Sequence, residues 1–199
     1  MVEHREGETP VMTGICHDIT PRKLGEIELA TRLRQQEAVA DLSRFALETD
    51  DMLQLYDRAC HLLANTLEVE MTKVLELTPD KRALVLRAGV GWRRGAVGNV
   101  TVGIERDSQA GYTLLAPAPV VVTDLKTETR FSGPTLLHDH GVIAGMSTII
   151  AGANDAPFGV LGVHTARSRI FTRYDVNFLE AVANILGSAV QRVAAAEQQ

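Results

Sequence analysis

The sequence predicts an α+β fold, a central antiparallel β-sheet with the N- and C-terminal helices packed on one face and short helices and loops over the other. Both ends of the 199-residue chain carry apolar residues at the three- and four-residue spacing of helices. The middle holds short apolar runs bounded by Gly, Pro and Asp turns, as strands do. Because these strands do not alternate with long helices, we expect an antiparallel sheet with the helices segregated from it.

The N-terminal region is expected to enter a long helix. Residues 1–10 are charged and predict a disordered arm, and residues 11–15 are compatible with a short strand. The run Asp18-Ile-Thr-Pro21 is a helix start with Thr20 as its cap. Residues 24–47 contain no proline, so they predict one long helix.

A second helix and the sheet follow. The pair Asp50-Asp51 predicts the start of a helix that ends at Leu67 and buries Leu53, Leu55, Leu62 and Leu63. Residues 89–103, with five glycines and the single tryptophan, predict a mobile loop. Short helices are expected at residues 108–115 and 134–140, with strands at residues 71–77, 83–88, 119–123, 142–151 and 158–165.

The last helix is expected to run from about Tyr174 into the 190s and to pack on a partner. Apolar residues recur there at steps of three and four, the spacing of a coiled-coil seam. With two residues of the first helix they form the predicted dimer interface: Leu29, Leu33, Leu179, Val182, Leu186, Ala189 and Val193. Phe178 and Ile185 form a second stripe that could face the sheet. The alternative is that both stripes belong to the core.

Composition limits the function. The net charge of −5, without a basic stripe, argues against a nucleic-acid partner. No apolar run approaches the roughly 20 residues that cross a bilayer, and the charged N-terminus does not resemble a signal peptide. We therefore expect no membrane contact and a cytoplasmic location. Cys16 and Cys60 are far apart, which fits a reducing compartment and excludes a Cys-rich zinc site.

Several motifs together resemble a GAF domain, the small-molecule and dimerisation module of bacterial signalling proteins. They lie between residues 42 and 193, in the order QAGY, PVVVTDL, ETRF, LLHDHGVIAGMSTII, FGVLGVHTA, RIFTRYDVNFLEAVANIL and AVQR. The resemblance implies a GAF/PAS-like sheet and a pocket over it, under the connecting loops.

A second resemblance lies upstream, where GICHDITPRK is similar to the exit of a PAS domain. The implied order is an arm and PAS exit tail at residues 1–20, a coupling helix at 21–48, a GAF domain at 42–193 and an outgoing helix at 190–199. This order implies a longer protein of the sensor histidine kinase or cyclic-di-nucleotide enzyme type, with adjacent PAS and output domains.

The resemblance also bears on ligands. Ser132 and Gly133 occupy the places of the Cys-His pair that holds a bilin in phytochrome-type GAF domains, so covalent bilin attachment is not expected. Half of the motif typical of cyclic-nucleotide GAF domains is present: Phe171 and Asp175 match it, whereas Val176 stands in place of its Glu. Binding of a cyclic nucleotide therefore stays an alternative, and so does a haem bound by His164.

Candidate ligand contacts come from the loops and strand ends around this implied pocket. They are Trp92, Tyr112, Asp124, Phe131, Leu137, Met146, Ser147 and His164. His138, Asp139 and His140 are adjacent on a helix end and point in different directions, so no metal site is predicted. The sequence does not indicate a nucleophilic side chain paired with a general base.

These patterns predict a non-catalytic regulatory module that dimerises through its terminal helices and takes a small ligand of unknown identity. The alternatives are a small GAF-like enzyme of the methionine sulfoxide reductase type and a haem or cyclic-nucleotide sensor. The enzyme would need a set of nucleophilic cysteines, which two dispersed cysteines do not supply.

Overall fold

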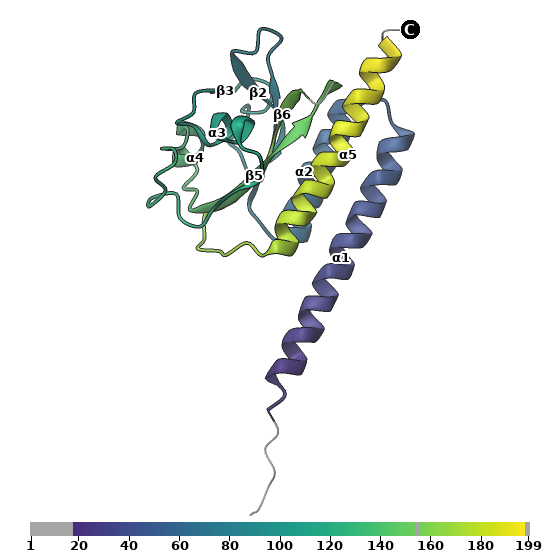
Figure 1. The fold of residues 1–199 in the computed structure, drawn as a ribbon, viewed down its shortest axis with the longest axis vertical. Coiled ribbons are helices and arrows are strands. Elements are labelled where there is room, and N and C mark those ends of the chain that lie inside the picture. Colours follow the sequence, from purple (N-terminus) through teal and green to yellow (C-terminus); the bar gives the residue numbers. More distant parts are fainter. Residues whose placement is uncertain (1–17, 154–155, 198–199) are drawn as a thin grey trace, which may run out of the picture.

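The fold is a six-stranded antiparallel sheet between a layer of long helices and a layer of loops and short helices (Figure 1). The computed structural model describes residues 18–153 and 156–197. The strand order is β3-β2-β1-β6-β5-β4. The strands are β1 (Met71–Leu77), β2 (Ala83–Val90), β3 (Thr101–Gly103), β4 (Val120–Val122), β5 (Ala144–Ala151) and β6 (Pro157–Thr165). The predicted α+β class is confirmed.

The long helices cover one face of the sheet. They are α1 (Thr20–Glu48), α2 (Met52–Leu67) and α5 (Arg173–Glu197). In Figure 1, α1 and α5 run side by side in the same direction, and α2 lies against the sheet beside α5. Hydrogen bonds join α1 and α5 at both ends of their contact, from Gln35 to Asp175 and from Arg192 to the carbonyl of Ala46.

The other face of the sheet, which we call the loop face, carries α3 (Gln109–Leu115), α4 (Thr135–Asp139) and their connections (Figure 1). Strand alternation divides the residues between the two faces. Val74, Leu161 and Val163 belong to the core cluster under the helices, whereas Leu75 and Val160 belong to a cluster under the loops. Both faces are thus buried, which is why the central strands are almost continuously apolar.

Residues 89–103 differ from the predicted loop at both ends, because residues 89–90 continue β2. Residues 101–103 form the edge strand β3, which pairs with β2 through Ala83 to Val85. The strand is short and the segment is rich in glycine, so no two-residue apolar pattern marks it. The other five predicted strands are present, with ends shifted by one to two residues.

Two local predictions at helices are wrong. Thr20 lies inside α1, after an Ile19 cap, and its amide is bound by the Asp18 carboxylate at 2.9 Å. Leu53 is 59% exposed because it faces away from the sheet in the first turn of α2. The predicted arm at 1–10, the strand at 11–15 and part of the turn at 154–157 lie outside the described residues.

The predicted dimer seam on α5 is also corrected. Leu179, Val182, Leu186 and Ala189 are at most 2% exposed and belong to the chain's own core with α1, α2 and the sheet. A helix packed on its own sheet repeats apolar residues at the same steps as a coiled-coil seam, so spacing alone could not separate the two. Leu29 and Leu33 are exposed, and Val193 is half-buried.

The cap of α2 gives a simple stability test. The Asp51 carboxylate accepts hydrogen bonds from the amides of Leu53 and Gln54 at 3.0 and 3.1 Å. Asp51→Ala should lower the free energy of unfolding by about 1 kcal/mol, measured by urea denaturation. Asp57→Ala, on the exposed side of the same helix, is the control and should change it by less than about 0.5 kcal/mol. Equal effects would contradict the cap.

No helix among residues 18–153 and 156–197 is both long and apolar enough to cross a membrane.

Candidate functional site

Six of the eight predicted ligand contacts lie on the loop face. Trp92, Tyr112, Phe131 and Leu137 pack there in one cluster, and the Tyr112 and Phe131 rings lie 5.3 Å apart. Ser147 and His164 belong to the sheet beneath them. The six are Trp92, Tyr112, Phe131, Leu137, Ser147 and His164.

The other two predicted contacts lie elsewhere. Met146 is fully buried in the core under the helices, because neighbouring residues of a strand point to opposite faces. Met146 and Ser147 therefore do not share a pocket floor. Asp124 lies in the loop after β4, where its carboxylate binds the amide of Lys126 at 2.9 Å and closes a turn.

Ser147 anchors α3 to the sheet. Its hydroxyl accepts a hydrogen bond from Gln109 Nε2 at 3.1 Å and lies 2.8 Å from the hydroxyl of Thr113. All three side chains are buried, and Thr113 is also bonded to the Gln109 carbonyl. The network is satisfied, so its role in this arrangement is to hold α3 in place.

Beside this network lie two buried basic side chains that we call the Lys73–His164 pair. Lys73, on β1, is 1% exposed and His164, on β6, is 0% exposed. Among the described residues, neither the Lys73 Nζ nor either ring nitrogen of His164 has a hydrogen-bond partner. Because more than 90% of buried polar groups are hydrogen-bonded, two adjacent unpaired basic side chains need an explanation.

Burial changes the acid-base chemistry of the pair. Loss of water lowers the pKa of Lys73 to about 7. The same loss, with repulsion from Lys73, holds the pKa of His164 well below its usual range. At neutral pH Lys73 is therefore partly protonated and His164 is neutral.

Two glycines make room for the pair. Lys73 is registered with Gly162 across β1 and β6, and Gly145 is registered with His164 across β5 and β6. A Cβ atom at Gly162 would lie 3.0 Å from Lys73 Cε and 3.1 Å from His164 Nε2. Both side chains therefore lie over the same bare piece of backbone.

Aromatic side chains close the space above the pair. The Trp92 ring centroid lies 6.1 Å from that of His164, and Lys73 Nζ is 5.9 Å from the Trp92 centroid. Trp92 donates a hydrogen bond to the Thr72 carbonyl at 2.6 Å and meets His140 edge-on at 5.0 Å. His140 accepts from the Arg93 amide at 3.0 Å, so its other nitrogen donates to the Leu136 carbonyl at 2.8 Å.

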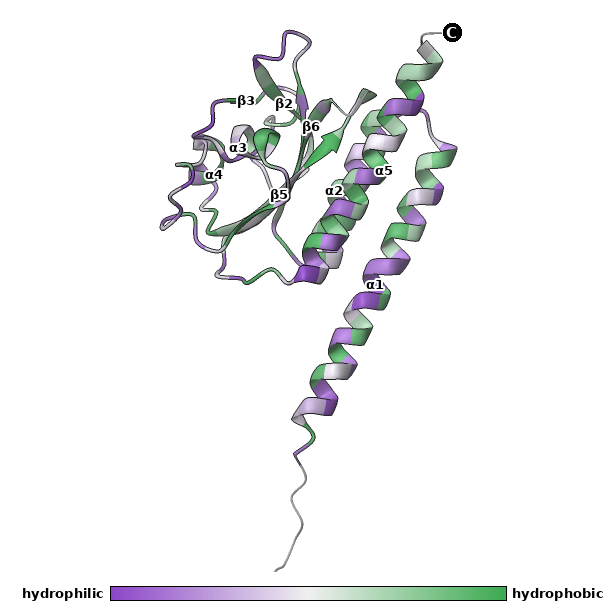
Figure 2. Ribbon diagram, in the orientation of Figure 1, coloured by the Kyte–Doolittle hydropathy of each residue, from purple (hydrophilic) through white to green (hydrophobic). Residues whose placement is uncertain are grey.

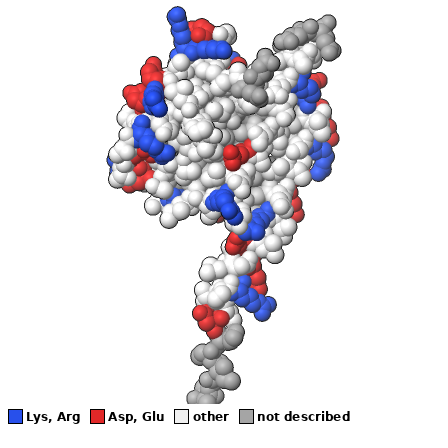
Figure 3. All heavy atoms as spheres, viewed as in Figure 1, with Lys and Arg blue, Asp and Glu red and all other residues white. Residues whose placement is uncertain are grey.

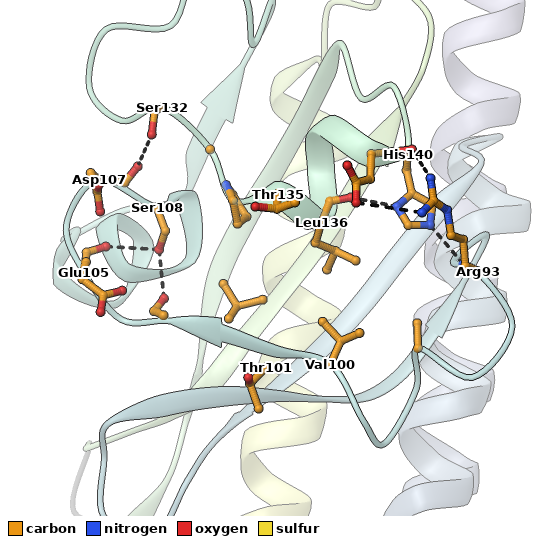
Figure 4. A pocket seen from close by; sticks show the side chains of 16 residues that line it. Arg93, Val100, Thr101, Glu105, Asp107, Ser108, Ser132, Thr135, Leu136 and His140 are labelled. Atoms are coloured by element: carbon orange, nitrogen blue, oxygen red, sulfur yellow. Dashed lines mark hydrogen bonds and ion pairs between the residues drawn. The ribbon is translucent and has the colours of Figure 1, made fainter.

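A cavity of about 510 Å³ lies on the outer side of this roof. His140 and Arg93 form one end of it, and the start of α3 forms the other, where Ser108 caps the helix (Figure 4). Leu136 and Val102 contribute apolar surface. The cavity and the Lys73–His164 pair are thus separated by two rings in edge-to-face contact, His140 and Trp92.

The sequence prediction missed Lys73 and the cavity lining. Lys73 stands in the strand MTKVLEL, where the period of two places it on the same side as Met71 and Leu75. A lysine between two inward-facing apolar residues is the signal that could have indicated it. The cavity is formed by loops that meet only in the fold, so no local pattern marks it.

The residues near His164 do not fit a haem. Trp92 contacts the His164 ring edge-on, and Lys73 Cε and His164 Nε2 both crowd the backbone of Gly162, so a porphyrin has no space at either ring nitrogen. The described residues contain no group of three or more His, Cys, Asp or Glu that could hold a metal ion. His138 instead bonds to the Ser132 carbonyl at 2.7 Å.

Comparison with known families decides the identity of this fold. The family model described as "GAF domain" matches residues 51–190. The chain belongs to the GAF domain family. Among curated proteins the comparison found no match.

Solved structures of GAF domains share the fold. The GAF domain of the phosphoenolpyruvate-protein phosphotransferase from Coxiella burnetii has a TM-score of 0.74 at 13% identity, over 84% of this chain and 99% of that one. Its counterpart from Acinetobacter has a TM-score of 0.70 at 14% identity, over 83% and 98%. The free methionine-R-sulfoxide reductase from Neisseria meningitidis, in complex with its substrate, has a TM-score of 0.68 at 14% identity, over 81% and 91%.

Proposed function

We propose that this GAF domain is a non-catalytic sensory module of a cytoplasmic signal-transduction protein. It works as a homodimer through α1 and α5. A small molecule bound on the loop face shifts those helices. The PAS-like exit before α1 and an output domain after α5 would belong to the same protein, of the sensor histidine kinase or cyclic-di-nucleotide enzyme type. Residues 1–17 of that exit lie outside the described structure.

The observation that carries the proposal is the free part of α1. Residues 20–30 are exposed throughout, and the helix extends well beyond the body of the domain (Figure 1). Leu24, Ile27 and Leu29 are each about 60% exposed there. A lone helical segment of this length is only marginally stable in water, so a partner helix is the simplest source of its stability.

The exposed apolar residues of α1 continue as a seam. Leu29, Leu33, Ala40 and Leu47 fall at steps that follow a heptad, with Gln36 and Ser43 between them. Figure 2 shows hydrophobic and hydrophilic stretches alternating along α1. The seam borders grooves between α1 and α5 that include Ala181 and Ile185. Acidic and basic side chains alternate along the protruding helix (Figure 3) and pair within it, Arg22 with Glu26 and Arg32 with Glu28, as on the solvent-exposed face of a helix.

A route from the loop face to the helices exists in β6. His164 and Gly162 face the loops, whereas Leu161 and Val163 of the same strand pack in the core with α5. A displacement of β6 by a ligand would reach α5 without an intermediate element. Parallel helices of this kind can take two packings, and a ligand that prefers one would bias the output.

The proposal is tested by light scattering on the purified protein. The wild type should be a dimer, and the double variant Leu33→Asp with Leu47→Asp should be a folded monomer, because four aspartates in the seam would repel one another. Leu115→Asp is the control: Leu115 is 67% exposed but lies on α3, so the dimer should persist. A monomeric wild type at high micromolar concentration would contradict the proposal.

The sulfoxide reductase alternative is less well supported. Cys60 lies in α2 in the core under the helices, away from the loop face. Burial raises the pKa of its thiol to about 12, so it is not a nucleophile at neutral pH. Cys16 lies outside the described residues.

A further inference from the structure

We infer that the Lys73–His164 pair is the binding site for the carboxylate of a small organic monocarboxylic acid. This inference rests on the proposed sensory function and adds the ligand class. The two side chains are the unpaired polar groups on the loop side of the sheet among the described residues, and both lie over the bare backbone of Gly162.

The hydrogen-bonding capacity of the pair matches a carboxylate. The Lys73 ammonium can donate to one oxygen, and the neutral His164 ring can donate an N–H to the other. Lys73 Cε and His164 Nε2 lie 3.0 and 3.1 Å from the position of a Cβ atom at Gly162, so the two side chains meet over this residue. A bound carboxylate would therefore satisfy the groups that are now unpaired.

Charge favours a monovalent ligand. Lys73 supplies one positive charge, and desolvation together with Lys73 keeps His164 neutral. A carboxylate balances that single charge, whereas a divalent phosphate or sulfate would be balanced only if His164 also took up a proton against its desolvation. A neutral amide would leave the lysine charge uncompensated instead.

The surroundings favour an organic acid over a bare inorganic ion. Leu75 and Val160 flank the pair on the same strands and are both fully buried. Leu136 joins the same cluster and also lines the outer cavity. These residues offer apolar contact to a hydrocarbon body whose head lies at Lys73.

Entry requires the roof to open. Trp92 belongs to the connection between β2 and β3, where Gly91, Gly95 and Gly98 all have positive φ values. If the Trp92 and His140 rings swing aside, the pair joins the 510 Å³ cavity, which already borders His140. Because Trp92 is the single tryptophan of the chain, its fluorescence reports this opening directly.

The test is a fluorescence titration of the full chain at pH 7 and constant ionic strength. Acetate, butyrate and benzoate are the probes, with acetamide, butyramide and benzamide as neutral controls, and sulfate and cyclic AMP as a divalent and a bulky anion. At least one acid should give a saturable change in Trp92 emission and raise Tm, with an affinity at least tenfold above its amide. Sulfate and cyclic AMP should bind more weakly than that acid.

Variants locate the site. Lys73→Met should weaken binding of that acid at least tenfold, and so should Gly162→Ala, whose methyl group would press on both side chains and displace them. Lys126→Met, at an exposed lysine, should bind like the wild type. The inference is overturned if none of the three acids binds, if amides bind equally well, or if Lys73→Met binds unchanged.

The outcomes separate this inference from the proposed function. A monomeric protein that binds the acid through Lys73 would contradict the sensory dimer and support the site. A dimer that responds to none of the acids would contradict the site and leave the dimer supported.

Discussion

The free energy of unfolding should rise by about 2 kcal/mol between pH 6.5 and 8.5 because of Lys73. Burial lowers the pKa of Lys73 from 10.5 to about 7 in the folded protein. Between these values the unfolded chain binds more protons than the folded one, so stability increases with pH. The penalty for burying the charged amine is complete below about pH 7 and diminishes above it. Urea denaturation at a series of pH values measures the effect.

Two other titratable groups limit the pH range in which Lys73 dominates the change in stability. The pKa of His164 lies well below its usual 6.5, so its contribution also favours the folded state as pH rises, but only about 0.4 kcal/mol of that contribution falls above pH 6.5, where the unfolded histidine loses its proton. Burial raises the pKa of Cys60 from 9.0 to about 12, so above about pH 9 the unfolded thiol ionises and stability falls. Within the window Lys73 is the main source of the slope.

Lys73→Met isolates the cause. Methionine keeps much of the side-chain volume without the amine, so the variant should be more stable than the wild type by roughly 3 kcal/mol at pH 6.5 and should lose most of the slope. Lys126→Met is the control and should keep the slope. A variant less stable than the wild type at pH 6.5 would show that Lys73 has a partner in the folded protein.

A gain in stability with a loss of acid binding would mean that this chain keeps an unfavourable buried lysine for its function. Ligand sites are commonly strained or destabilised before the ligand arrives. In the bound state the carboxylate would offset the charge of Lys73, so ligand binding and protonation of the lysine should favour each other.

Leu186→Ala should lower the free energy of unfolding by about 3 kcal/mol without separating the dimer. Leu186 is fully buried in the core between α5 and the sheet, so its truncation leaves a cavity inside one chain. Urea denaturation at several protein concentrations, with light scattering on the folded state, measures both effects.

The matched control is Leu115→Ala, at an exposed leucine, which should change the free energy of unfolding by less than about 0.5 kcal/mol. A folded Leu186→Ala monomer of unchanged stability would instead place Leu186 in the dimer interface. Together with the Leu33 and Leu47 variants, this pair separates the core of the domain from its dimer surface.

Local pattern predicted most of the framework. The long helices, five of the six strands and the α+β class follow from apolar periodicity and turn residues, which act over a few residues of sequence. Motif order added the family, which the match over residues 51–190 confirms. Strand β3 was missed because three residues at a sheet edge are held by pairing with β2 and carry no periodicity of their own.

Which residues form the candidate site depends on the face of the sheet to which each side chain points, and sequence periodicity does not determine that face. In a sheet buried on both sides, apolar residues point in both directions, so Met146 and Ser147 could not be assigned to different faces until the sheet was packed. The same ambiguity placed Leu186 on a dimer seam when it belongs to the core.

The sequence by itself determined all the long helices, five of the six strands, their order and the family, because helix and strand formation and motif order are properties of neighbouring residues. Only the tertiary structure decided that Lys73 and His164, 91 positions apart in the chain, lie over one glycine without a partner. Strand pairing brings distant residues together, and burial then removes the water that would otherwise have satisfied both of them.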